Sequence, residues 1–173
     1  MRLWGLLHAL HQVKGYSEII DTLNGRLDGQ PPSVDLAIPE AVRPFLLAGL
    51  RGDLQAPILI VTSRRDRARQ IYEQTKVWSQ SPSGLLLFPE PDMLSYERIP
   101  WDMIIAQDRL FALTTLALGD TGGIQPWLVV TSLRALLQKT VPRDRFLDSL
   151  LKLAVDGQMG KTQLLEALRG LGY

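Results

Sequence analysis

The stretch Gly157–Thr162 has the sequence GQMGKT. Glycine, lysine and threonine bind phosphate groups in many nucleotide-binding proteins. A phosphate-binding P-loop has the form G-x-x-x-x-G-K-[ST], in which enough backbone N–H groups surround the phosphates before the lysine is reached. Counting back from Gly160, the first glycine of that pattern falls on Val155, and Gly157 comes two residues too late. The spacing therefore favours a turn followed by the start of a helix over a nucleotide site.

Four arginines lie close together, at Arg64, Arg65, Arg67 and Arg69. They open an expected helix, where the helix dipole disfavours cations, so an anionic partner such as the DNA backbone would relieve an unfavourable interaction. The alternative is an ordinary solvated helix face, which runs of charge usually form. These four residues are the candidates for a DNA or anion contact.

Other groupings of polar residues are incomplete as catalytic or metal sites. His8 and His11 could share one face of a helix, but no third metal ligand is clustered with them. Glu90, Asp92 and Glu97 lie in a proline-rich loop without a histidine partner, and we interpret them as surface charges. We therefore expect no catalytic, cofactor-binding or metal-binding residue in this chain.

The composition is typical of an ordinary globular protein. The chain has 173 residues, is 46% hydrophobic and 21% charged, and carries a formal net charge of +1. These values exclude a disordered chain and a strongly basic nucleic-acid arm, and the absence of cysteine excludes disulfides, zinc ribbons and thiol catalysis. No stretch approaches the roughly 18 consecutive apolar residues of a membrane span, and the opening residues read as an amphipathic helix, so we expect no membrane contact and a cytoplasmic location.

Apolar segments that alternate with helical patterns predict the fold class. The segments expected as strands are 56–62, 84–88 and 126–131, and the helices expected to follow them are 64–78, 103–118 and 133–139. Strands and helices in this alternation predict βαβ units, a parallel sheet and an α/β fold. The strand at 56–62 is continuously apolar and β-branched, which is typical of a strand buried on both faces of a parallel sheet.

Local signals predict how several helices begin. Ser17 is a candidate N-cap for an early helix at 17–27, and Ser132 for the helix after the third strand. Ser63 with Asp66 fits a capping box.

A short apolar run at 34–38 is expected to be the leading strand, which places the P-loop position of such a fold at Ala37–Arg43. That segment has no glycine, no lysine and no serine or threonine. Pro39 lacks an N–H donor, and Glu40 would repel a phosphate. If the fold descends from a nucleotide hydrolase, this site has been erased.

The segment Phe88–Glu97, continued by Gln107–Leu110, resembles a stretch in the N-terminal part of bacterial transcription-repair coupling factors (Mfd). There, an acidic–x–Leu–x–Tyr–acidic pattern precedes a helix that bears Arg-Leu, and the region is similar to the excision-repair helicase UvrB. Further segments that match in order and spacing are Trp127–Leu133, Leu136–Gln138 with Pro142, Gly157–Gln158 and Leu171–Tyr173. The resemblance covers most of the chain from about residue 34 onward.

The resemblance implies a helicase-type (RecA-like) α/β domain with a degenerate P-loop over residues 34–145. An N-terminal helical segment at 1–33 would precede it, and the first elements of a small α+β domain of the UvrB-interaction type would follow at 146–173. In this family the UvrB-like module does not hydrolyse ATP, so no cofactor is expected here and ATP would belong to later motor domains. The residues that dock onto UvrA and the RNA-polymerase-binding domain would also lie beyond Tyr173.

Two functions follow as expectations. The first is a non-catalytic module of a protein that recognises stalled RNA polymerase and recruits nucleotide excision repair through UvrA. The alternative is a UvrB-like ATPase or helicase fragment that binds DNA. Only Gly160-Lys161-Thr162 supports this alternative.

Overall fold

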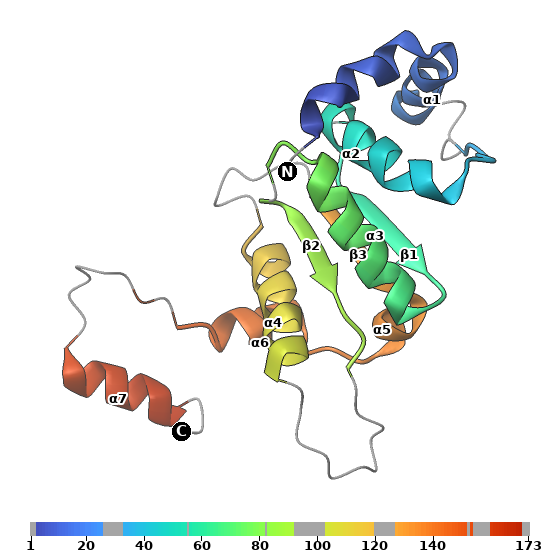
Figure 1. Cartoon of the computed structure of the whole chain (residues 1–173). Coiled ribbons are helices and arrows are strands. Elements are labelled where there is room, and N and C mark those ends of the chain that lie inside the picture. Colours follow the sequence, from blue (N-terminus) through green and yellow to red (C-terminus); the bar gives the residue numbers. More distant parts are fainter. Residues whose placement is uncertain are drawn as a thin grey trace.

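A computed structural model describes residues 3–25, 33–54, 56–81, 83–91, 103–119, 127–151, 153 and 160–170. Figure 1 shows a small central sheet with helices on both of its faces, the N-terminal helices packed at one end, and the last helix lying apart. The elements are the 3-10 helices η1 (Trp4–Gln12) and η2 (Glu40–Val42), the strands β1 (Ile58–Thr62), β2 (Leu85–Phe88) and β3 (Leu128–Ser132), and the helices α1 (Lys14–Asn24), α2 (Arg43–Asp53), α3 (Arg65–Trp78), α4 (Met103–Leu118), α5 (Leu133–Leu137), α6 (Arg143–Asp148) and α7 (Lys161–Gly170).

The sheet has three parallel strands in the order β1-β3-β2. Leu128 at the start of β3 pairs with Ile58 on one side and with Leu85 on the other, so all three strands begin at the same level. Each strand is followed by a helix, as the alternation of apolar and amphipathic segments predicts. The expected α/β class with a parallel sheet is confirmed.

Helices cover the two faces of the sheet unequally. On one face, Ala68 and Ile71 of α3 pack in a cluster with Leu85, Leu128 and Val130. On the other face, the small side chains of α4 and α5 lie against β2 and β3, and this cluster comprises Leu86, Phe88, Ala112, Val129 and Ala135. As a result, every residue of β2 and β3 is buried.

β1 differs from its neighbours, and the prediction that it is buried on both faces was wrong. Leu59 and Val61 are 55% and 46% exposed, while Ile58 and Ile60, which alternate with them, pack against the cluster that contains Ala68 and Ile71 of α3. The reason is tertiary: α4 lies over β2, so the corresponding face of β1 stays open. A groove of about 420 Å³ remains there, lined by Leu59, Leu116 and Trp127 among others.

The N-terminal helices form a second cluster with α2. Leu10 and Tyr16 pack against Leu46 and Leu50, and a Cβ atom at Gly49 would collide with the Leu10 side chain. The early helix is α1, which begins at Lys14; Ser17 therefore lies inside it, donating to the Lys14 carbonyl at 2.9 Å, and is not its N-cap.

The predicted leading strand at 34–38 was also wrong. The segment makes no strand pairing. Ile38 packs against the N-terminal cluster, whereas Leu36 is exposed. The first strand of the described sheet is β1, which the sequence analysis places correctly.

Of the two predicted N-caps at the sheet, one is confirmed. The Ser132 hydroxyl accepts a hydrogen bond from the backbone N–H of Ala135 at 3.2 Å and caps α5. The capping box of Ser63 and Asp66 was wrong, because the N-cap of α3 is Arg64 and no side chain caps that helix.

The C-terminal part has two short helices. α6 is tied to α4 by Arg143, which donates to the Ala117 carbonyl from Nε at 3.1 Å and Nη2 at 2.7 Å. α7 begins directly after Gly160, in agreement with the helix start expected within Gly157–Thr162. Between α6 and α7, residues 152 and 154–159 lie outside the described part of the chain. Among the helices that the structure describes, none combines the length and the apolar character needed to cross a membrane.

Candidate functional site at the carboxyl edge of the sheet

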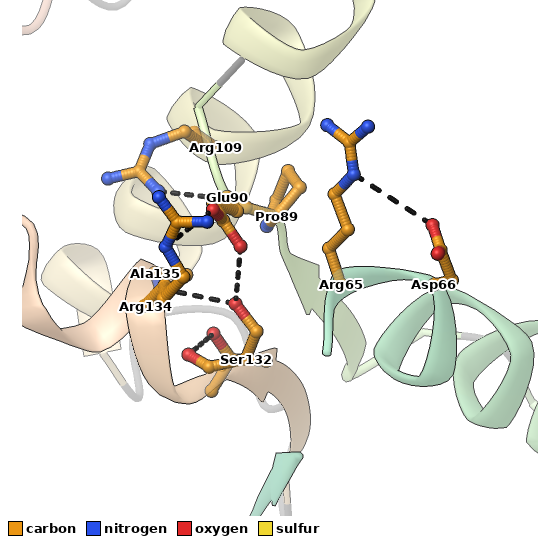
Figure 2. Close-up of polar contacts among 9 residues, drawn as sticks. Arg65, Asp66, Pro89, Glu90, Arg109, Ser132, Arg134 and Ala135 are labelled. Atoms are coloured by element: carbon orange, nitrogen blue, oxygen red, sulfur yellow. Dashed lines mark hydrogen bonds and ion pairs between the residues drawn. The ribbon is translucent and has the colours of Figure 1, made fainter. Parts of the chain in front are cut away.

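The carboxyl ends of the three parallel strands meet at one edge of the sheet, where α/β proteins usually bind their ligands. β1 ends at Thr62 and leads into α3, β2 ends at Phe88, and β3 ends at Ser132. Figure 2 shows the polar side chains gathered there: Arg65 and Asp66 on one side, and a cluster around Glu90 on the other.

Glu90 follows β2 and holds the ends of two strands together. Its Oε2 accepts a hydrogen bond from Ser132 Oγ at 3.3 Å, and its Oε1 lies 3.2 Å from Nε of Arg134. Only 12% of the Glu90 side chain is exposed. The interpretation of Glu90 as a surface charge was therefore wrong, because the chain folds this residue back onto the start of α5. Asp92 and Glu97 lie outside the described residues.

Arg109 lies beside this cluster, on the buried side of α4, and is 8% exposed. Its guanidinium lies over the Phe88 ring, 4.1 Å from the centroid, and Nη1 donates to the Pro89 carbonyl at 2.5 Å. Burial lowers the pKa of Arg109. Sequence reasoning missed this role; the available signal was an arginine in a helix in which eleven of sixteen residues are apolar.

The four arginines proposed as an anion contact divide into two groups. Arg64 and Arg65 are well exposed and share Asp66, with Nη2 of Arg64 at 3.5 Å and Nε of Arg65 at 3.8 Å from its carboxylate oxygens. Arg69 is also exposed. Arg67 instead forms an ion pair with Glu40 and donates to Gln70 Oε1 at 2.9 Å.

The ion pair between Arg67 and Glu40 borders a cavity of about 860 Å³ between the 36–43 segment, β1 and α3. Its lining contains three arginines, Arg43, Arg64 and Arg67, and two carboxylates, Glu40 and Asp66, so these charges sum to +1. The rest of the lining is largely apolar. A phosphate that bound Arg67 in this cavity would have to displace the Glu40 carboxylate, and Glu40 would repel it.

The Walker-like motif lies far from this edge. Gly160 precedes α7, and its N–H donates to Gln163 Oε1 at 3.3 Å. Lys161 is the first, exposed residue of the helix. Residues 154–159 lie outside the described part of the chain, so the structure describes only the end of the motif.

The two histidines have separate partners. His8 Nδ1 contacts the Gly5 carbonyl, whereas Nε2 of His11 lies 3.6 Å from an Asp53 oxygen and its ring meets the Tyr16 ring edge-on. Tyr16 donates a hydrogen bond to Asp53, and burial together with this bond raises the pKa of Tyr16. Within the described ranges, no group of three or more histidine and acidic side chains could hold a metal ion.

Comparison with known proteins adds no relative: no protein-family model and no curated protein sequence matches this chain.

Proposed function

We propose that this chain is a non-catalytic interaction module: a helicase-type, RecA-like α/β domain whose nucleotide site is degenerate. It would serve a protein that recognises RNA polymerase stalled at DNA lesions and recruits nucleotide excision repair through UvrA. The resemblance of Phe88–Glu97 and the later segments to transcription-repair coupling factors supports this identity. The single observation that supports a non-catalytic role most directly is the ion pair of Arg67 with Glu40.

The ion pair matters because of where it lies. No strand precedes the 37–43 segment in the part of the chain that the structure describes, so it corresponds to the P-loop by the resemblance alone; in this chain it presents Glu40 to the cavity. Pro39 supplies no N–H, and the Glu40 carboxylate already pairs with the guanidinium of Arg67. The cavity therefore lacks the two features that a nucleotide site requires, backbone donors from a glycine-rich loop and an available lysine.

Titration calorimetry with ATP and ADP in the presence of magnesium tests the non-catalytic role. We expect no binding by the intact chain, and replacing Lys161 by alanine should change nothing. Micromolar binding would contradict the proposal. If that binding were lost in Lys161→Ala, it would favour the alternative of an active P-loop ATPase.

The partners require a separate test, since nucleotide binding says nothing of them. Purified UvrA and RNA polymerase can be passed over the immobilised chain, alone and within the longer protein. We expect retention in the longer context, where the remaining docking domains are present. Failure of both partners to bind the longer protein would contradict the repair role while leaving the non-catalytic fold in place.

A second candidate function, DNA binding, is favoured by the exposure of the arginines that open α3. The side chains of Arg64 and Arg65 are 78% and 58% exposed and project from the carboxyl edge of the sheet. If they contact phosphates, DNA affinity should fall with rising salt and should fall again in Arg64→Ala/Arg65→Ala. Lys139→Ala/Arg169→Ala removes the same charge elsewhere and should leave the affinity unchanged.

A further inference from the structure

The outward side of α4 carries an apolar surface that the functions above do not use. Its exposed residues, which we name the outer stripe, are Met103, Ile104, Leu110, Phe111 and Leu118, with exposed fractions of 69%, 64%, 54%, 67% and 47%. A helix on the surface of a domain normally turns polar residues outward. A contiguous apolar surface of this kind marks a site of interaction.

The outer stripe cannot simply rotate inward. The opposite side of α4 is already packed on the sheet, with Ala112 fully buried and Leu113 and Leu116 beside it. Arg109 further locks the helix through its contacts with Phe88 and Pro89. The helix therefore has apolar residues on two sides, and only one of them meets the sheet.

α7 offers the complementary surface within the same chain. Leu164, Leu165 and Leu168 recur at spacings that place them on one side of the helix, and none of the residues of α7 is buried. A helix of ten residues is marginal in water unless its apolar side packs against something. Figure 1 shows α7 lying apart from the sheet and its covering helices, beyond α6.

We infer that the outer stripe of α4 is a docking surface for α7 of the same chain. The connection permits it: α6 is held at the end of α4 through Arg143 and the Ala117 carbonyl, and twelve residues separate Asp148 from Lys161. Twelve residues can span up to about 40 Å, whereas α4 is only about 24 Å long.

Charge does not oppose this arrangement. In α6, which packs beside α4, Arg143 and Arg145 balance Asp144 and Asp148, and α7 carries Lys161, Glu166 and Arg169. Tethering also keeps the effective concentration of α7 in the millimolar range, so a modest apolar contact suffices. This inference concerns packing within the chain and holds whether or not the repair or DNA-binding roles do.

The absence of cysteine permits a direct test by cross-linking. Gln107→Cys places a thiol beside the outer stripe, and Ala167→Cys places one beside the apolar side of α7. With a short bismaleimide at micromolar protein concentration, we expect rapid formation of an intramolecular cross-link. The matched control is Arg69→Cys/Ala167→Cys, which keeps the tether but puts the thiol on α3, across the sheet.

Phe111→Asp in the Gln107→Cys/Ala167→Cys background provides the specific disruption. Because Phe111 is exposed, the fold should survive, which far-ultraviolet circular dichroism checks, while the cross-linking rate should fall about tenfold or more, as expected for loss of about 1.4 kcal/mol of docking energy. Equal rates in the test and control pairs, cross-linked dimers in place of monomers, or indifference to Phe111→Asp would each overturn the inference. If Phe111→Asp unfolds the chain, Phe111→Ser takes its place with the same expected direction.

Discussion

Two groups of arginines lie at the same edge of the sheet, and they differ in how far they are exposed to solvent. Arg64 and Arg65 are exposed, and both approach one carboxylate, Asp66. Arg109 is buried against Phe88, and next to it Arg134 meets the largely buried Glu90. Arg64 and Arg65, two of the arginines that cluster in the sequence, are therefore expected to contribute less to the fold than Arg109, which is the single arginine of an apolar helix.

The physical difference is solvation. An ion pair between exposed side chains gains little, because water screens the attraction and both side chains lose conformational freedom; such pairs contribute roughly 0 to 1 kcal/mol. A buried guanidinium that meets an aromatic face and a carbonyl replaces its lost hydration with fixed contacts, and removing it leaves the carbonyl without a donor. Four variants, given in order of decreasing expected loss of stability, test this difference.

Arg109→Ala should have the largest effect. It removes the contact with the Phe88 ring and the hydrogen bond to the Pro89 carbonyl, and opens space under α4. We expect a loss of about 2–3 kcal/mol in the free energy of unfolding, measured by urea denaturation. Arg109→Lys keeps the charge but not the planar group, so its free energy of unfolding should lie between those of the unchanged chain and Arg109→Ala. A loss below about 0.5 kcal/mol would show that this arginine does not hold the end of β2.

Ser132→Ala should cost about 1 kcal/mol, since it removes both the N-cap of α5 and a donor to Glu90. Ser63→Ala is the matched control at the start of α3, where no side chain caps the helix, and it should leave the unfolding midpoint nearly unchanged. Equal losses of stability in the two variants would indicate that Ser63 caps α3, in contradiction to the structure.

Glu90→Ala should destabilise the chain by somewhat less than 1 kcal/mol, because its partner Arg134 is itself two-thirds exposed. A double-mutant cycle with Arg134→Ala isolates the pair, and we expect a coupling energy of about 0.5 kcal/mol that shrinks in high salt. A coupling energy of zero would mean that Glu90 acts through Ser132 alone.

Arg64→Ala/Arg65→Ala should have the smallest effect on the fold, within about 0.5 kcal/mol in the free energy of unfolding. Any larger consequence of this variant should therefore appear in binding to an anionic partner. Destabilisation comparable to that of Arg109→Ala would remove the contrast between the two groups.

The order of the elements was predictable because each one depends on short-range patterns. The apolar runs around Ile60, Leu86 and Val129 were predicted as strands, and Ser132 was predicted to cap the helix that follows β3. Whether a strand is covered on both faces is a different matter, since it depends on where a helix distant in the sequence comes to lie. For the same reason the exposure of Leu59 and the burial of Glu90 were not predicted.

The α/β class, the parallel sheet and the position of the exposed arginines could be read from the amino-acid sequence, because periodicity, β-branching and charge act within a few residues. Three further features depend on tertiary packing: Ile38 joins the core although the 34–38 segment forms no strand, Glu40 pairs with Arg67, and the guanidinium of Arg109 lies over the Phe88 ring. The last two contacts join residues more than twenty positions apart, and their geometry depends on how the helices pack against the sheet.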